Sequence, residues 1–158
     1  MLLKIISGGQ TGADMGALLA GRQLGIRTGG CAPKGWLTEN GPQETLLRSF
    51  GLLECEEDGY PARTRRNVTG SDGTLLVGPH PTGGTRLTYD LAKELKKPLF
   101  ILDCVNPRQM TADRVRIEDF QSWVQHDHIK VLNVAGNRES QTPGIAEFTR
   151  VFLANALL

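Results

Sequence analysis

Two segments of the sequence have the residue types that bind phosphate groups in proteins. The first is SGGQTG, residues 7–12, which follows a short apolar run and precedes residues that favour a helix. Glycine allows tight backbone turns, and the amide groups at the start of a helix attract anions. We therefore expect this loop to contact a phosphate through its backbone. The predicted binding residues are Gly8, Gly9, Gln10, Thr11 and Gly12.

The second segment is GPHPTGGTRLT, residues 78–88, in which a glycine pair opens another helix. Gly83, Gly84 and Thr85 are its predicted phosphate-binding residues. We expect neighbouring strands to bring both loops to one edge of a sheet, where two helix N-termini facing one cleft would favour an anion. Two unrelated turns are the alternative. His80 lies in the same loop and is a further candidate for a contact with the ligand.

Between these loops, a predicted helix carries four polar residues on one face, at relative positions i, i+3, i+4 and i+7. They are Tyr60, Arg63, Thr64 and Asn67. An arginine on such a face can clamp a phosphate or a carboxylate, so we expect Arg63 or Lys34 to supply positive charge. Asn67 or Asp14 would fix polar groups of the ligand. The alternatives are a solvated helix surface and, for Asp14, a purely electrostatic role at a helix start.

The spacing of apolar side chains predicts the elements that position these residues. The predicted strands cover residues 2–6, 26–31, 50–55, 73–78, 99–102 and 130–134, and helices are predicted around residues 13–24, 60–67, 87–95, 117–124 and 145–152. Strands that alternate with helices are typical of a parallel sheet. We expect an α/β, Rossmann-like, doubly wound fold, with a mostly parallel sheet and helices on both faces. A single ligand-binding domain, residues 1–158, is expected.

Ligands of open parallel sheets bind beyond the carboxyl ends of the strands. The informative segments are therefore 7–12, 31–41, 78–85, 103–108 and 136–140. One irregular segment, residues 32–43, is long for a loop of a compact domain, which is typical of a functional or mobile loop. Trp36 in this segment would either stack on an aromatic ligand or pack in a subunit contact.

The composition narrows the classes of function. The chain of 158 residues is 39% hydrophobic and 22% charged, with a net charge of +1, so no strong field calls for nucleic acid or an anionic membrane. No apolar run is long enough to span a bilayer, and the first residues lack the layout of a signal peptide. We expect a cytoplasmic protein. Neither the three scattered cysteines, Cys31 among them, nor the surface turn predicted at residues 126–128 (HDH) indicates a metal site.

Two nucleotide-binding motifs lack residues that they require. The first loop resembles the dinucleotide fingerprint, with serine in place of the first glycine. That fold requires a carboxylate after the second strand to bind the ribose, whereas residues 28–32 read TGGCA. A P-loop is excluded because no Gly-Lys-Ser/Thr follows the glycines. We therefore expect a phosphorylated ligand other than NAD, or a tight turn without a ligand.

Seven segments, in order along nearly the whole chain, resemble the molybdenum (molybdopterin) cofactor carrier family. They are SGGQTGAD, APKGWLTENG, YPARTRRNV, SDGTLLV, TGGTRLTYDLA, KKPLFIL and VLNVAGNRES. That family is similar to the Rossmann-like group that includes the cytokinin-activating phosphoribohydrolases. The resemblance implies a doubly wound fold, a homo-oligomer and a phosphate-bearing ligand at the strand tips, with molybdopterin as the carried cofactor. The residues that match the family's binding segments are Gly8, Gly9, Gln10, Thr11, Gly12, Lys34, Gly35, Arg63, Thr64, Asn67, Gly83, Gly84 and Thr85.

The sequence departs from these families at two positions. Asn137 stands where a proline is expected, and Thr88 stands where the phosphoribohydrolases carry a glutamate that does chemistry. Without that carboxylate, activation of water at a ribose is poorly supported. We therefore expect a binding protein for a phosphorylated nucleotide-like or pterin-like ligand, with no catalytic residue assigned. The alternatives are a phosphoribohydrolase or N-glycosidase that uses Glu39 or Asp14, and an interaction module with a vestigial cleft.

Overall fold

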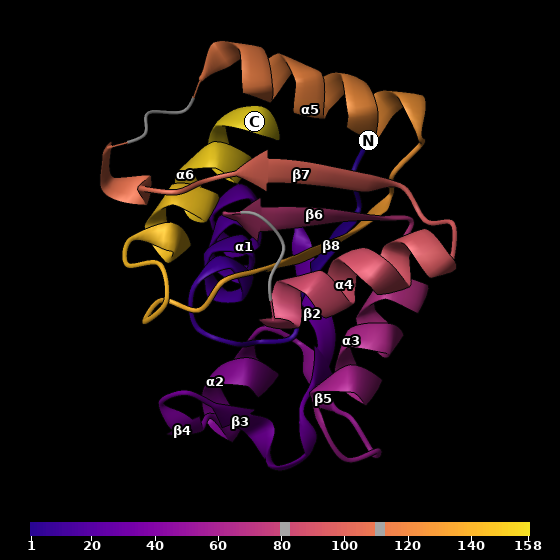
Figure 1. Cartoon of the computed structure of the whole chain (residues 1–158), viewed down its shortest axis with the longest axis vertical. Helices are drawn as coiled ribbons and strands as arrows, with labels where there is room; N and C mark the ends of the chain where they lie inside the picture. The colour runs from indigo at the N-terminus through magenta and orange to yellow at the C-terminus, as the bar shows by residue number, and fades with distance from the viewer. Residues whose placement is uncertain (80–82, 110–112) are drawn as a thin grey trace.

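The computed structural model describes residues 1–79, 83–109 and 113–158. Within these ranges a six-stranded parallel sheet has the order β5-β2-β1-β8-β6-β7 (Figure 1). Its strands are β1 (Lys4–Ile6), β2 (Arg27–Ala32), β5 (Leu52–Glu54), β6 (Gly73–Gly78), β7 (Leu99–Asp103) and β8 (Val131–Gly136). The α-helices are α1 (Ala13–Leu24), α2 (Glu44–Ser49), α3 (Tyr60–Thr69), α4 (Gly83–Glu94), α5 (Arg114–His126) and α6 (Ile145–Ala156).

Helices cover both faces of the sheet. Figure 1 shows α1 and α6 on one face and α3 and α4 on the other. Buried side chains of α1, α5 and α6 share one hydrophobic cluster, whereas α3 and α4 share another around Val68 and Leu91. The predicted α/β, Rossmann-like, doubly wound fold is therefore confirmed.

Strand β8 lies at the centre of the sheet, although it is the last strand along the chain. It pairs with β1 on one side and with β6 on the other. The expectation that β1 and β6 are neighbours is wrong, because β8 separates them. The chain winds outward from β1 to β5 in one direction and from β6 to β7 in the other, so the winding reverses at β8.

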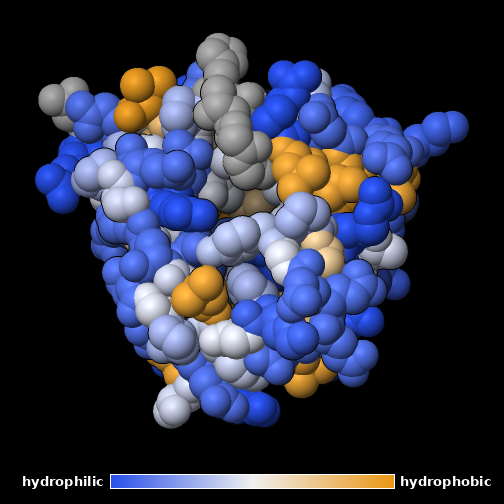
Figure 2. All heavy atoms as spheres, turned by 60° about the horizontal axis from the view of Figure 1, so that its bottom comes forward, coloured by the Kyte–Doolittle hydropathy of each residue, from blue (hydrophilic) through white to orange (hydrophobic). Residues whose placement is uncertain are grey.

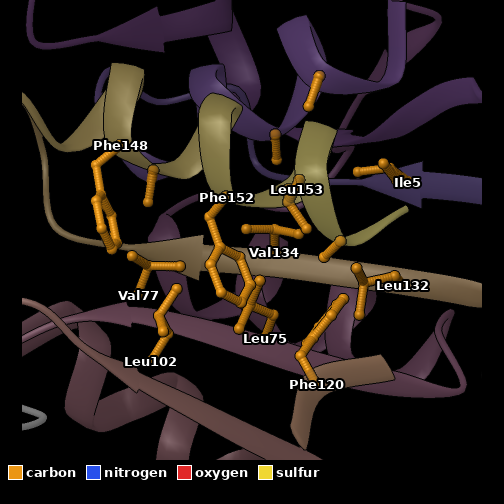
Figure 3. Close-up of a cluster of buried hydrophobic side chains, with 14 of the residues drawn as sticks. Ile5, Leu75, Val77, Leu102, Phe120, Leu132, Val134, Phe148, Phe152 and Leu153 are labelled. Atoms are coloured by element: carbon orange, nitrogen blue, oxygen red, sulfur yellow. The ribbon is translucent and has the colours of Figure 1, made fainter. Parts of the chain in front are cut away.

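The largest hydrophobic cluster fixes the sheet against α5 and α6. Figure 3 shows side chains of α6 pointing toward those of β6, β7 and β8. Phe120 of α5 meets Phe152 of α6 edge to face, with ring centroids 5.5 Å apart. Burial of one such aromatic side chain contributes about 2–3 kcal/mol. This packing gives the strand tips a rigid base.

Small residues let α1 lie close to α6. Ala13, Ala17 and Ala20 are completely buried on this face of α1. A Cβ atom on Gly16 would lie 2.2 Å from the carbonyl oxygen of Ala146, so only glycine fits there. The small-residue face of α1 is therefore used within the chain.

The segment of residues 32–43 is ordered, contrary to the expectation of an irregular loop. It contains a short 3-10 helix (Lys34–Trp36) and a hairpin of β3 (Leu37–Thr38) and β4 (Gly41–Pro42). The hydroxyl of Thr38 donates to the carbonyl of Gly41 at 2.8 Å and closes the hairpin turn. Trp36 is buried in a hydrophobic cluster with Leu47 and Phe50. This packing within the chain accounts for the tryptophan without stacking on a ligand or a contact between subunits.

A membrane-spanning helix requires a long apolar stretch of chain. No helix in the described part of the chain is long and apolar enough to cross a bilayer. Figure 2 shows a largely hydrophilic face with several separate hydrophobic patches, the broadest of them at the upper right. The exposed hydrophobic side chains of the described residues include Leu37 of β3, Leu46 of α2 and Leu53 of β5.

Candidate ligand-binding site

A cavity of about 270 Å³ opens at the carboxyl end of β8, where the winding reverses. We call it the arginine cavity, after Arg63 and Arg138. Ligands of doubly wound sheets bind at this kind of switch point. The described residues that line it are Gly8, Gln10, Asp14, Tyr60, Arg63, Thr64, Asn67, Thr85, Leu87, Thr88, Asn133, Ala135, Gly136, Asn137, Arg138 and Gln141.

The four residues predicted to share one face of α3 all line this cavity. Gly59 precedes the helix with a φ of 91°, and Pro61 favours the helical conformation in its first turn. The guanidinium of Arg63 lies 5.3 Å from the centre of the Tyr60 ring. It also lies against Gly8, where a Cβ atom would be only 1.7 Å from Nη1 of Arg63. Any side chain at position 8 would therefore displace the guanidinium from this place.

Asp14 is buried at the inner end of this cavity. Its Oδ2 accepts from the amide of Gln10 at 3.1 Å and from Nη1 of Arg63 at 3.4 Å. Burial raises the pKa of Asp14 from 3.8 to about 6, although Arg63 and the amides of Gln10 and Gly8 oppose that rise. Asp14 is thus an acidic residue in the first turn of α1 that also lines the cavity, and its contact with a ligand stays a prediction.

The amides of the first glycine loop are largely used by the chain itself. The amide of Gly9 donates to Oγ of Ser7 at 3.3 Å, and that of Gln10 donates to Asp14. The amide of Thr11 donates to Oε1 of Gln10 at 3.0 Å. A phosphate would have to displace these acceptors, so the loop is not an empty cradle of amides.

Two of the loop glycines are explained by packing. Gly9 has a φ of 77°, and a Cβ atom there would lie within 3.0 Å of Leu47 and Leu52. Gly12 has a φ of 81°, and a Cβ atom there would lie 2.2 Å from the carbonyl oxygen of Asn137. The backbone of Gly12 thus lies too close to the backbone of the loop after β8 for any other residue, whereas at Gly9 the positive φ is what favours glycine.

The opposite side of this loop faces a second cavity of about 460 Å³, which we call the glutamate cavity. Its described lining includes Glu39 and Glu139 and no lysine, arginine or histidine. Glu39 accepts from the hydroxyls of Thr11 and Ser140, and these hydrogen bonds lower the pKa of its carboxyl. Glu139 accepts from the amides of Gly144 and Ala146 at 2.5 and 3.1 Å, and so caps the start of α6.

Strand β8 and the loop after it supply cavity residues that were not among the predicted binding residues. Asn133 and Asn137 line the floor, and the guanidinium of Arg138 lies 5.7 Å from the centre of the Tyr60 ring. The sequence predicts that segment 136–140 lies near a ligand, because it follows the last strand. Only the central position of β8 reveals that Arg138 and Arg63 line one cavity, each near the ring of Tyr60.

The structure does not bring every predicted residue to this cavity. Lys34 is exposed and pairs with Asp58 at 3.4 Å. Asn67 lines the cavity, but its amide clamps the backbone of Cys31, accepting at 2.8 Å and donating at 3.0 Å. Gly83 and Gly84 form the start of α4, from which Thr85 and Thr88 reach the lining.

Two further sequence predictions concerned metal binding and His80. The described residues contain no group of three or more His, Cys, Asp or Glu side chains that could hold a metal ion. Helix α5 ends at His126, and Asp127 and His128 form the turn that follows, as predicted. The contact proposed for His80 lies outside the described residues.

Comparisons with known proteins agree with this architecture. No curated protein matches the chain. The crystal structure of the "Putative molybdenum carrier protein" from Syntrophus aciditrophicus SB is 40% identical, with a TM-score of 0.84 over 99% of this chain and 96% of that one. A family model described as circularly permuted YpsA SLOG matches residues 5–157. Circular permutation agrees with a central strand that comes last along the chain. The chain therefore belongs to the circularly permuted YpsA SLOG family.

Proposed function

We propose that this protein binds a phosphorylated small molecule with a planar heterocycle, a nucleotide or a pterin, in the arginine cavity. The observation that carries the proposal is the meeting of Arg63 and Arg138 at the switch point of the sheet. Arginine forms strong, often bidentate, hydrogen bonds with phosphate. The start of α4 adds the positive end of a helix dipole on the same side.

The rest of the lining suits a heterocycle. Side-chain amides of Gln10, Asn133, Asn137 and Gln141 surround the cavity, and amides offer both donors and acceptors to the edge of a ring. Asn133 uses its amide nitrogen to donate to the hydroxyl of Thr74 at 3.2 Å. Small-molecule sites usually occupy about 300–1,000 Å³. A cavity of about 270 Å³ therefore suits a mononucleotide or a pterin better than a dinucleotide.

Molybdopterin, a pterin with a phosphate, is the ligand that we favour within this class. The name of the 40% identical protein from Syntrophus aciditrophicus supports it, as does the order of matching segments along the sequence. The proposed role is binding and release, with the ligand left intact. Thr88 in the cavity, at the position of the glutamate of the phosphoribohydrolases, supports binding over hydrolysis.

An N-glycosidase is the second candidate function, and one observation favours it. Asp14 is the carboxylate in the described lining of the arginine cavity, and its pKa of about 6 suits a general acid or base. Glu39, the other candidate base, lines the glutamate cavity instead. Release of free base from AMP, lost in Asp14→Asn, would establish this alternative.

The proposal is tested by titrating the purified protein with molybdopterin and with AMP in a calorimeter, alongside native mass spectrometry of any copurified molecule. We expect Arg138→Gln to weaken binding on the order of tenfold, since a hydrogen bond to a charged group contributes about 1.5–3 kcal/mol. Arg65→Gln is the control, because Arg65 is exposed on α3 and pairs with Glu94. No binding of either compound, or equal binding by both variants, would overturn the proposal.

Assembly and location are parts of the proposal that stay predictions. A homo-oligomer and a cytoplasmic location are expected from the family resemblance and the sequence. A single domain is expected for residues 1–158, because one sheet spans strands from both ends of the chain.

A further inference from the structure

Arg63 has hydrogen-bond donors that the described residues do not use. Its side chain is only 14% exposed, and its one ion-pair contact is the 3.4 Å approach of Nη1 to Asp14. Its Nε is buried and has no partner in the described part of the chain. Because a buried charged donor without an acceptor is costly, the arrangement indicates an acceptor that arrives with a ligand.

The position of the guanidinium is fixed before any ligand binds. It lies against Gly8 on one side and near the Tyr60 ring on the other. A fork held in this way loses little entropy when it binds an oxyanion. Arg63 is therefore preorganised as the anion-binding group of the arginine cavity.

The charge beside Arg63 works against an anion. The carboxylate of Asp14 shares Nη1 of Arg63 and lines the same cavity. The charged groups of the described lining are Asp14, Arg63 and Arg138. With Asp14 ionised, the lining carries one net positive charge, and with Asp14 protonated it carries two.

We propose that Asp14 sets the charge of the ligand that this cavity accepts: an anion binds Arg63 together with a proton that Asp14 takes up. The inference rests on the proposed function, because it concerns the same cavity and the same class of ligand. Asp14 acts here as a specificity-determining residue.

The groups around Asp14 make proton uptake the easier outcome. Arg63 of α3 and the amides of Gly8 and Gln10 act on its carboxyl. Four other elements also pack against α1, namely α6, β1, β2 and β8. Among the described residues of these elements, no charged side chain adds to the effects on the pKa of Asp14. Arg138 and the Tyr60 hydroxyl are the other titratable groups in the cavity, and α4 contributes only Thr85, Leu87 and Thr88.

Magnitudes favour protonation over charge repulsion. Burial already raises the pKa of Asp14 to about 6, so protonating it at neutral pH lowers affinity only about tenfold. An anion about 5 Å from an ionised carboxylate, at an effective dielectric constant of about 20, would lose more than about a hundredfold in affinity to repulsion. The complex with protonated Asp14 is therefore favoured.

The experiment measures the affinity of the purified full chain for two probes that keep their charge over the range studied. These are inorganic sulfate and cyclic AMP, and sodium chloride at equal ionic strength is the control for screening. We expect affinity to fall about twentyfold between about pH 5.5 and about pH 7.5, and the proton uptake on binding to rise over the same range from about a quarter of a proton to close to one. Proton uptake is read from binding heats in two buffers with different ionisation enthalpies.

Two variants separate this inference from the function on which it rests. Asp14→Asn should bind the probes with a flat pH profile and without proton uptake, and at least as tightly as the unmodified chain at the higher pH. Glu39→Gln, on the far side of the same loop, should keep the pH dependence. Binding without pH dependence in the unmodified chain, or with unchanged pH dependence in Asp14→Asn, would overturn the inference and leave the function standing. Failure of both probes to bind at any pH would overturn both.

Discussion

The two cavities on either side of the first glycine loop differ in charge, although they share one wall. Gly8, Gln10 and Asp14 face the arginine cavity, whereas Gly9, Thr11 and Gly12 face the glutamate cavity. The arginine side has a buried ion pair with unused donors. On the glutamate side, both carboxylates have hydrogen-bond donors from the chain itself.

This difference shows that one loop can have a structural side and a ligand-binding side. The glutamate side holds the loop to the hairpin and to the start of α6 through Glu39 and Glu139. The arginine side keeps its charged donors at a cavity. A glycine-rich strand-to-helix turn is therefore not evidence for a phosphate cradle until the partners of its amides are known.

The largest expected effect tests the shared wall itself. Gly12→Ala would place a Cβ atom against the carbonyl of Asn137 at a φ that only glycine adopts easily. We expect it to lower the free energy of unfolding by about 4 kcal/mol, measured by urea denaturation. Gly25→Ala is the matched control, because Gly25 also has a positive φ but nothing within 4 Å. It should cost only about 1 kcal/mol. Equal losses in the two variants would contradict this account of the wall.

A smaller effect is expected on the arginine side, where the titration of Asp14 should make the free energy of unfolding depend on pH. The raised pKa of Asp14 means that the folded chain holds this proton up to about pH 6, whereas the unfolded chain releases it near 3.8. The free energy of unfolding should therefore fall as pH rises through this window, by on the order of 2–3 kcal/mol. The Asp14→Asn variant should lack that part of the pH dependence in urea denaturation. A parallel pH profile in the variant would refute the assignment.

The smallest effect concerns the glutamate side, where the sign is reversed. Hydrogen bonds lower the pKa of Glu39 in the folded chain. Ionised Glu39 therefore adds to the free energy of unfolding at pH values above the ordinary pKa of a glutamate, and this contribution is lost as pH falls. Glu39→Gln should loosen the hairpin of residues 37–42, with amide exchange less than about tenfold faster at neutral pH. The control is Glu56→Gln, an exposed carboxylate in the loop before α3. Unchanged exchange in Glu39→Gln would mean that the hairpin is held by packing alone.

The sequence predicts the elements of this fold better than their arrangement. Strand β6 has the predicted bounds of residues 73–78, because a buried strand between two glycines is a strong local signal. The placement of β8 between β1 and β6 depends on pairing across the chain. Helix α2 escaped prediction because it has only six residues, of which Leu47 alone is buried.

The candidate site shows the same division. The shared face of Tyr60, Arg63 and Thr64 follows from helical spacing and is present in the structure. The pairing of Asn67 with the backbone of Cys31 could not be predicted, because residue type does not reveal which partner a side-chain amide will find. Arg138 could not be singled out for a related reason, since its neighbours belong to α3.

The central position of β8 has a consequence for the order of events during synthesis. While the ribosome is still translating the segment before residue 131, β1 and β6 both exist but have no native neighbour on the side where β8 will lie. Two unpaired strand edges would then face each other or the solvent, and such edges are prone to wrong pairing. The native sheet can form only after β8 inserts, so a nascent chain of this protein would need protection until then.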